Sequence, residues 1–208
     1  MGSKLNFDLK DFKTDYHIHL VEQFDKIASL YPGQEYLIRC HRGIDIGNFI
    51  KSQFKRYSLC SENERMFLSF NLIDEPDPVY HVKKGLEGDF HDELVNICIH
   101  FEQIHMLSLS NQRLLYNALK DRDSFLFTTY LKKKNRSDTS YYIPHFLFFT
   151  TEIDLRDRCI SGTFLWELYI LINKCEFEIK GLSERNILES KNILFQMISY
   201  YAHEFGVN

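Results

Sequence analysis

The chain has 208 residues, of which 44% are hydrophobic and 26% charged, and its formal net charge is -4. These proportions are typical of globular proteins and exclude a disordered, collagen-like or coiled-coil chain. The negative net charge supplies no overall field that would draw the protein onto nucleic acid or anionic lipid.

The predicted elements in the first half alternate between helix and strand. Thr14 is a candidate N-cap for an amphipathic helix that ends before Pro32 and Gly33. Apolar periodicity then predicts a strand over 34–40, a helix over 45–57 and a strand over 66–73. The Pro and Gly residues of 74–89 predict a long surface loop, which is a candidate internal boundary in a chain otherwise expected to be a single domain over 1–208.

The second half is predicted to continue with helices over 91–107 and 112–119 and strands over 125–131 and 141–151. The polar residues of 132–139 favour a hairpin between those two strands. A helix is preferred over 164–173, and a long C-terminal helix is predicted over 183–205. Because not every strand is followed by a helix, we expect an α+β fold, a small mixed sheet of about four or five strands covered by about six helices.

Cysteine usage and the N-terminus indicate a protein of a reducing compartment. The five cysteines form no C-x-x-C pair, so free thiols are expected rather than disulfides or a zinc site. The first residues lack the apolar core of a signal peptide, and no apolar stretch is long enough to cross a bilayer. A cytoplasmic location is therefore expected.

Asp15, His17 and His19 form the sharpest local motif. This D-x-H-x-H string resembles the element by which metal-dependent amidohydrolases and the polymerase–histidinol-phosphatase superfamily bind a metal that activates water. The resemblance implies a metal-dependent hydrolase, but it covers five residues only. The predicted helix turns His17 and His19 about 200° apart, which prevents chelation of one ion. Paired histidines of this kind also occur in nicking enzymes with a tyrosine nucleophile, for which Tyr200 and Tyr201 are candidates.

Two further polar clusters offer alternatives. His91, Cys98, Glu102 and His105 would share one face of the helix expected over 91–107 and include one E-x-x-H, half of the motif used by di-iron bundles. The basic residues of the predicted hairpin would suit phosphate contacts as a nucleic-acid site, although they are equally typical of a solvated hairpin tip. These basic residues are Lys132, Lys133, Lys134 and Arg136.

Aromatic residues make up 15% of the chain, which indicates either A/T-rich codon usage or an aromatic-lined pocket or interface. No G-x-S-x-G, G-x-x-x-x-G-K-[ST] or G-x-G-x-x-G motif is present. The sequence therefore favours a non-enzymatic binding or regulatory module that needs no cofactor and binds a small apolar ligand or a protein partner. A homodimer through the 184–205 helix is also expected. The candidate ligand-binding residues are Tyr36, Phe70, Phe127, Phe146, Phe148 and Trp166.

Overall fold

A computed structural model describes residue 22 and residues 35–41, 46–57, 65–73, 77–86, 96–120, 146–181, 184–188, 190–192, 194, 195 and 198. The helix expected near Thr14, the strand over 125–131 and the hairpin over 132–139 lie outside these residues, apart from residue 22. In the described part of the chain, no helix combines the length and the apolarity that crossing a membrane requires.

Among the residues that the structure describes, five parallel strands form the centre of the fold, in the spatial order β2-β3-β4-β1-β5. The strands are β1 (Glu35–Cys40), β2 (Arg65–Asn71), β3 (Asn96–Glu102), β4 (Phe146–Thr151) and β5 (Cys175–Ile179). Each of the four strand pairings is parallel. The expected mixture of helices and strands is confirmed, but the α+β class with a mixed sheet is wrong: parallel neighbours need crossover connections, and these make the fold α/β.

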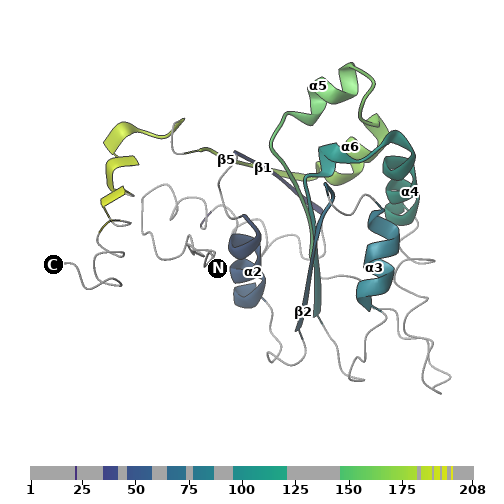
Figure 1. Cartoon of the computed structure of the whole chain (residues 1–208), viewed down its shortest axis with the longest axis horizontal. Helices are drawn as coiled ribbons and strands as arrows, with labels where there is room; N and C mark the ends of the chain where they lie inside the picture. Colours follow the sequence, from purple (N-terminus) through teal and green to yellow (C-terminus); the bar gives the residue numbers. More distant parts are fainter. Residues whose placement is uncertain are drawn as a thin grey trace, which may run out of the picture.

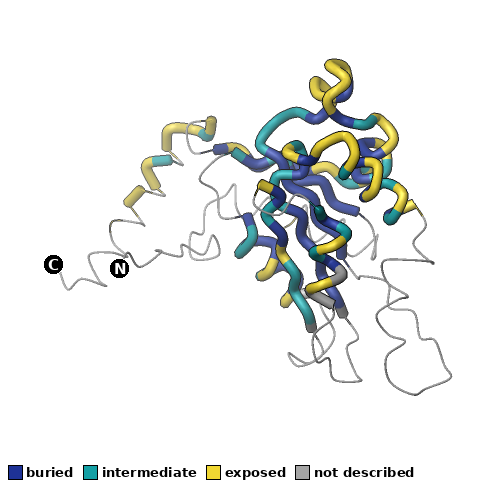
Figure 2. The backbone as a smooth tube through the Cα atoms, turned by 45° about the vertical axis from the view of Figure 1, so that its right-hand side comes forward, coloured by how far each residue is buried: buried dark blue, intermediate teal, exposed yellow. Residues whose placement is uncertain are grey.

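Helices cover both faces of the sheet. Helix α2 (Ile46–Tyr57) packs on one face, and α3 (Pro78–Leu86), α4 (Leu109–Lys120), α5 (Leu155–Ile160) and α6 (Trp166–Ile172) pack on the other (Figure 1). Strand residues alternate between the two cores: Leu37 of β1 joins the core under α3 to α6, whereas Tyr36 and Ile38 join the core under α2. Figure 2 shows the central strands buried between these layers.

The strand β3 replaces most of the helix that was expected over 91–107. Its residues Ile97, Ile99 and Phe101 face one core and Cys98 faces the other, so apolar residues occur at consecutive positions. A parallel strand buried on both faces gives this continuous apolar run, which periodicity alone does not distinguish from a buried helix. The short 3-10 helix Ile104–Met106 follows the strand.

Three elements were missed in the sequence. Helix α3 occupies residues 78–86, where proline and glycine had predicted a loop, and β2 and β3 on either side of it pair with each other. Pro78 begins this helix, a position where its missing N–H costs no hydrogen bond. Helix α5 and strand β5 are only six and five residues long, too short for a clear period.

Gln112 fastens α4 to the segment between α5 and α6. Its side chain is completely buried, and its Nε2 donates to the carbonyl oxygens of Leu107 at 2.7 Å and Thr163 at 3.1 Å. Its Oε1 accepts from the backbone N–H of Leu165 at 2.8 Å. One amide thus forms hydrogen bonds with three backbone groups, and two of them, on Thr163 and Leu165, are more than 50 residues away in the sequence. Buried polar groups of folded proteins are nearly always hydrogen-bonded in this way.

Candidate functional site

The sheet topology places a candidate site at the carboxyl ends of β1, β3 and β4. The helix after β1 lies on one face of the sheet, whereas the helices after the adjacent strand β4 lie on the other face. Such a reversal between neighbouring parallel strands is a topological switch point, where α/β proteins bind their ligands outside the carboxyl ends of the strands. The last side chains of these strands and those just after them form what we call the carboxyl-edge cluster: Cys40, Glu102, Gln103, His105, Thr151 and Glu152.

Gln103 connects the ends of β3 and β4. Its Nε2 donates a 2.8 Å hydrogen bond to Oε1 of Glu152, the first residue after β4. The Gln103 backbone has φ 61° and ψ 47°, the left-handed region that non-glycine residues seldom adopt. Strained backbone of this kind collects at functional sites, where the surrounding structure holds it in place.

Thr151, the last residue of β4, makes a second connection within the cluster. Its Oγ1 lies 3.0 Å from Nδ1 of His105, and it donates to the carbonyl oxygen of Ile153 at 3.1 Å. The Ile153 N–H lies 3.2 Å from the same hydroxyl oxygen. The ends of β3 and β4 are thus joined by two side-chain hydrogen bonds, which keep their polar groups in fixed positions.

Two carboxylates of the cluster act on the buried thiol of Cys40. Burial, followed by the nearby charges of Glu152 and Glu102, raises the pKa of Cys40 from 9.0 to about 12. This thiol is therefore protonated at neutral pH and has no nucleophilic role. Its environment also shows that both carboxylates lie near the end of β1.

Gly43 lies between β1 and α2, and Gly47 is the second residue of α2. The two glycines are four positions apart rather than the five of a G-x-x-x-x-G pattern, and the next residues are Asn48 and Phe49. A phosphate-binding G-x-x-x-x-G-K-[ST] loop has at that point a lysine and a hydroxyl residue, which hold the phosphates and a magnesium ion. The Phe49 side chain is 2% exposed and belongs to the core under α2. The chain therefore lacks the cation and the hydroxyl of that motif.

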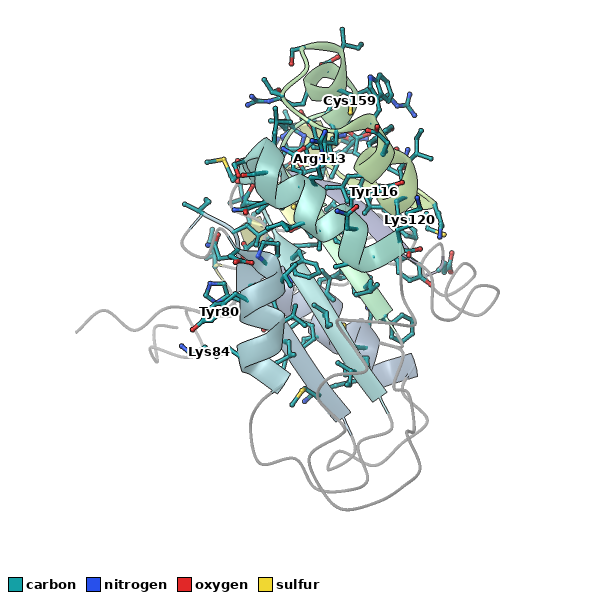
Figure 3. All side chains as sticks on the ribbon, turned by 90° about the vertical axis from the view of Figure 1, so that its right-hand side faces the viewer. Tyr80, Lys84, Arg113, Tyr116, Lys120 and Cys159 are labelled. Atoms are coloured by element: carbon teal, nitrogen blue, oxygen red, sulfur yellow. The ribbon has the colours of Figure 1, made fainter. Side chains whose placement is uncertain are left out.

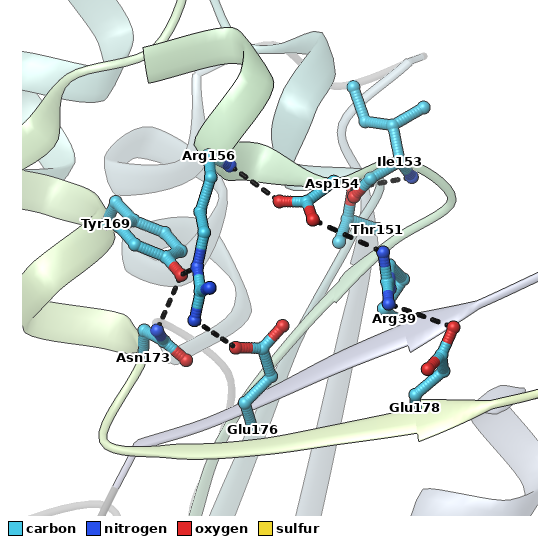
Figure 4. A network of polar contacts seen from close by, with 9 residues as sticks. All are labelled: Arg39, Thr151, Ile153, Asp154, Arg156, Tyr169, Asn173, Glu176 and Glu178. Carbon is cyan, nitrogen blue, oxygen red and sulfur yellow. Dashed lines mark hydrogen bonds and ion pairs between the residues drawn. The ribbon is translucent and has the colours of Figure 1, made fainter. Parts of the chain in front are cut away.

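Charged residues surround the end of β1 on the side of β5 (Figure 4). Arg39 contacts Glu178 at 2.9 Å and Asp154 at 3.4 Å. Asp154 also caps α5 by accepting from the N–H of Arg156 at 2.8 Å. Hydrogen bonds from Arg156 Nε and Asn173 Nδ2, each 2.7 Å, hold the Tyr169 hydroxyl. This network fixes α5 and α6 next to the candidate site.

The aromatic residues expected to line a pocket do not form one cluster. Tyr36, Phe146 and Phe148 pack in the core under α2, with the Tyr36 and Phe148 ring centroids 5.1 Å apart. Phe70 belongs to the opposite core, and Trp166 lies on the surface of α6 with 46% of its area exposed. Phe127 lies outside the described residues. The aromatic residues that the structure describes on β1, β2 and β4 fill both sides of the sheet.

The metal and nucleic-acid candidates are not placed by the structure. The Asp15, His17 and His19 motif and the basic 132–136 segment lie outside the described residues, as does His91. Cys98 and Glu102, expected on a helix, lie on strand β3 instead. Within the described ranges, no group of three or more His, Cys, Asp or Glu side chains is arranged to hold a metal ion.

The carboxyl-edge cluster was missed because its residues come from three separate strands. A usable signal was present: the apolar runs 97–101 and 146–149 are each followed closely by polar residues and a glutamate. Interpreting both runs as buried parallel strands would have placed Glu102 and Glu152 at one edge. The helix interpretation of 91–107 removed one of the two strands from consideration.

No family model and no curated protein matches the sequence. Among solved structures, NtrX from Brucella abortus in complex with ADP superposes with a TM-score of 0.62 at 12% identity, covering 100% of this chain and 45% of that one. The complex of NtrX with ATP gives a TM-score of 0.61 at 11% identity over 94% and 42% of the two chains. A third NtrX structure gives 0.56 at 13% identity over 83% and 38%.

These likenesses correct the functional expectation. The chain spans less than half of the NtrX chain, and at 12% identity the match establishes the shared fold alone. That fold is a parallel α/β domain, so the expected α+β binding module with an aromatic pocket is wrong. The metal-hydrolase and basic-hairpin alternatives rest on residues outside the described ranges, so the structure does not test them. The chain therefore has the α/β fold that NtrX contains, with its polar cluster at the carboxyl edge of the sheet.

Proposed function

We propose that this chain is a nucleotide-binding domain of the P-loop NTPase type that binds a nucleotide at the carboxyl-edge cluster without turning it over efficiently. The observation that carries the proposal is the switch point between β1 and β4, with Glu102, Gln103, Thr151 and Glu152 gathered beside it. The fold match supports it, because NtrX was solved with ADP and with ATP.

The missing lysine determines how such a site would work. With Asn48 and Phe49 after Gly47, no side-chain cation of this motif neutralises the phosphates. Glu102 and Glu152 add negative charge near the end of β1, so a bare nucleotide would be repelled. Magnesium is bound in proteins by one or two carboxylates together with substrate phosphates. Nucleotide binding at this edge is therefore expected to depend strongly on Mg²⁺.

Hydrolysis is expected to be slow for a related reason. Gln103 carries an amide, which takes no proton from an attacking water, and its Nε2 is engaged by Glu152. His105 shares its Nδ1 contact with Thr151. Without the lysine, the transferred phosphoryl group also lacks an electrostatic partner that such enzymes use.

The test is equilibrium binding of a fluorescent ADP, followed by anisotropy with Mg²⁺ and with EDTA. We expect at least tenfold tighter binding with Mg²⁺ for the wild type. The double substitution Glu102→Gln and Glu152→Gln should weaken binding in Mg²⁺ but leave it equal or tighter in EDTA, because it removes both the ligands and the repulsion. Glu176→Gln on β5 is the matched control and should change neither value. Absence of binding at 1 mM nucleotide with Mg²⁺ would overturn the proposal.

Asn48→Lys tests the role of the missing cation. A lysine in the first turn of α2 adds a positive charge where the phosphates are expected, so ADP affinity should rise about tenfold. Asn48→Gln, which is neutral, should have no such effect. Equal affinities in the two variants would show that the nucleotide does not approach the start of α2.

A further inference from the structure

Helices α3 and α4 concentrate positive charge in an acidic protein. Together they carry four Lys and Arg residues and no Asp or Glu, although the chain as a whole has 25 basic and 29 acidic residues. The two helices pack beside each other on the face of the sheet opposite α2. Acidic residues flank the two helices in the sequence: Asp77 precedes α3, Glu87 follows it and Asp121 follows α4. Asp77 accepts the N–H of Tyr80 at 2.9 Å.

Apolar and aromatic side chains are exposed on the same two helices. Tyr80 of α3 and Leu109 and Leu114 of α4 are 54%, 47% and 50% exposed. Lys120 lies over the ring of Tyr116, 5.7 Å from its centroid. Figure 3 views this side of the molecule, with Tyr80 and Lys84 on α3 and Arg113, Tyr116 and Lys120 on α4. We call these residues, with Leu109 and Leu114, the α3–α4 face.

The basic side chains of this face have no acidic partner within the described part of the chain. The ion pairs found there are formed by other side chains, namely Arg39, His41, Arg156 and Lys174. Lys84, Arg113 and Lys120 therefore present their charge outward. Protein interfaces are enriched in Tyr and Arg, and their buried centres are apolar.

We propose that the α3–α4 face binds an acidic segment of a partner protein that also carries apolar side chains, such as an amphipathic helix with Glu or Asp beside Leu or Phe. Charge complementarity selects the acidic side chains, and Leu109, Leu114 and Tyr80 supply the apolar contacts. Nucleic acid fits less well: duplex binding at physiological salt draws on roughly six to ten phosphate contacts, and this face offers three exposed described cations, Lys84, Arg113 and Lys120.

The test is selection of a phage-displayed library of random 16-residue peptides on the immobilised full chain. We expect the enriched peptides to carry a surplus of Asp and Glu together with apolar residues. They should bind the variant with Lys84→Glu, Arg113→Glu and Lys120→Glu at least tenfold more weakly, and their affinity should fall as salt rises from 50 to 300 mM. Lys51→Glu with Lys55→Glu on α2, the opposite face, is the matched control and should leave binding unchanged.

Three results would overturn the inference. Enriched peptides without an acidic surplus, or equal binding by the wild type and the α3–α4 variant, would show that the face does not select acidic segments. Displacement of the peptides by a 20-base-pair DNA at equal concentration would assign the face to nucleic acid instead. Circular dichroism of each variant checks that the fold is retained. The ADP-binding assay is a separate measurement, so its outcome does not decide whether the α3–α4 face binds acidic segments.

Discussion

At the scale of single residues, His100 is a fully buried imidazole inside the sheet. Its Nδ1 lies 2.9 Å from Ser69 Oγ on β2 and its Nε2 lies 3.1 Å from Thr150 Oγ1 on β4. Burial lowers the pKa of His100 from 6.5 to about 3. The ring is therefore neutral in the folded protein and connects three neighbouring strands through hydroxyl groups.

This pKa shift predicts a stability that depends on pH. Below about pH 6.5 the unfolded chain takes up a proton at His100, whereas the folded protein takes it up only near pH 3. The free energy of unfolding should therefore fall as the pH decreases through this window, by up to about 1.4 kcal/mol per pH unit from this group. Urea unfolding at pH 7, 6 and 5 of the wild type and His100→Asn measures the difference in slope. Equal slopes would mean that folding does not lower the pKa of His100.

At the scale of elements, short helices are held by buried side chains from their neighbours. Helices α5 and α6 have six and seven residues, too few to be stable as isolated helices. Gln112 of α4 reaches the segment between them, and the Arg156–Tyr169 hydrogen bond joins one to the other. Such elements form because the tertiary structure supplies their partners.

Gln112→Leu should therefore destabilise the domain. It leaves the carbonyls of Leu107 and Thr163 and the N–H of Leu165 buried without a partner, at a cost of about 2–4 kcal/mol. Chemical denaturation measures the loss. Gln53→Leu is the matched control: Gln53 is 5% exposed, and its Oε1 has no hydrogen-bond partner within the described residues, so its replacement should cost less than about 1 kcal/mol. Similar losses in the two variants would contradict a clamping role for Gln112.

At the scale of the whole molecule, the segment from 187 to 198 exposes an apolar face. Its large side chains are 51% to 70% exposed and fall within one helical arc. Faces of this kind in soluble proteins mark contacts with another surface. The residues concerned are Ile187, Leu188, Leu194, Phe195 and Ile198. Self-association through the 184–205 region thus stays a prediction.

Replacement of two of these side chains tests the predicted dimer. Leu188→Ser with Phe195→Ser removes apolar area that is exposed in the monomer, so it should leave the Tm nearly unchanged while raising the dimer dissociation constant at least tenfold. Sedimentation equilibrium of the full chain gives the dimer dissociation constants of the wild type and of the double variant. A wild-type chain that stays monomeric at 100 μM would remove the basis for this interface.

The sequence alone was enough to determine those helices and strands that can be predicted from the spacing of apolar residues within a short stretch of chain. The strands β1 and β2 and the helices α2, α4 and α6 were expected within about three residues of their observed bounds, and β4 lies inside the strand expected over 141–151. Each has a regular spacing of apolar residues or a clear boundary residue. The alternation of apolar and polar residues from Arg65 to Asn71 is one example of such spacing.

The tertiary structure alone decided strand direction, strand order and the candidate site. The run 97–101 is apolar at every position but His100 because both faces of β3 are buried, and periodicity does not separate that case from a buried helix. Glu102 and Glu152 are 50 residues apart in the chain, and both lie near Cys40 only because β3, β4 and β1 are neighbouring parallel strands. A local sequence pattern indicates whether each residue is buried or exposed. Which distant residues come into contact depends on which strands pair with each other.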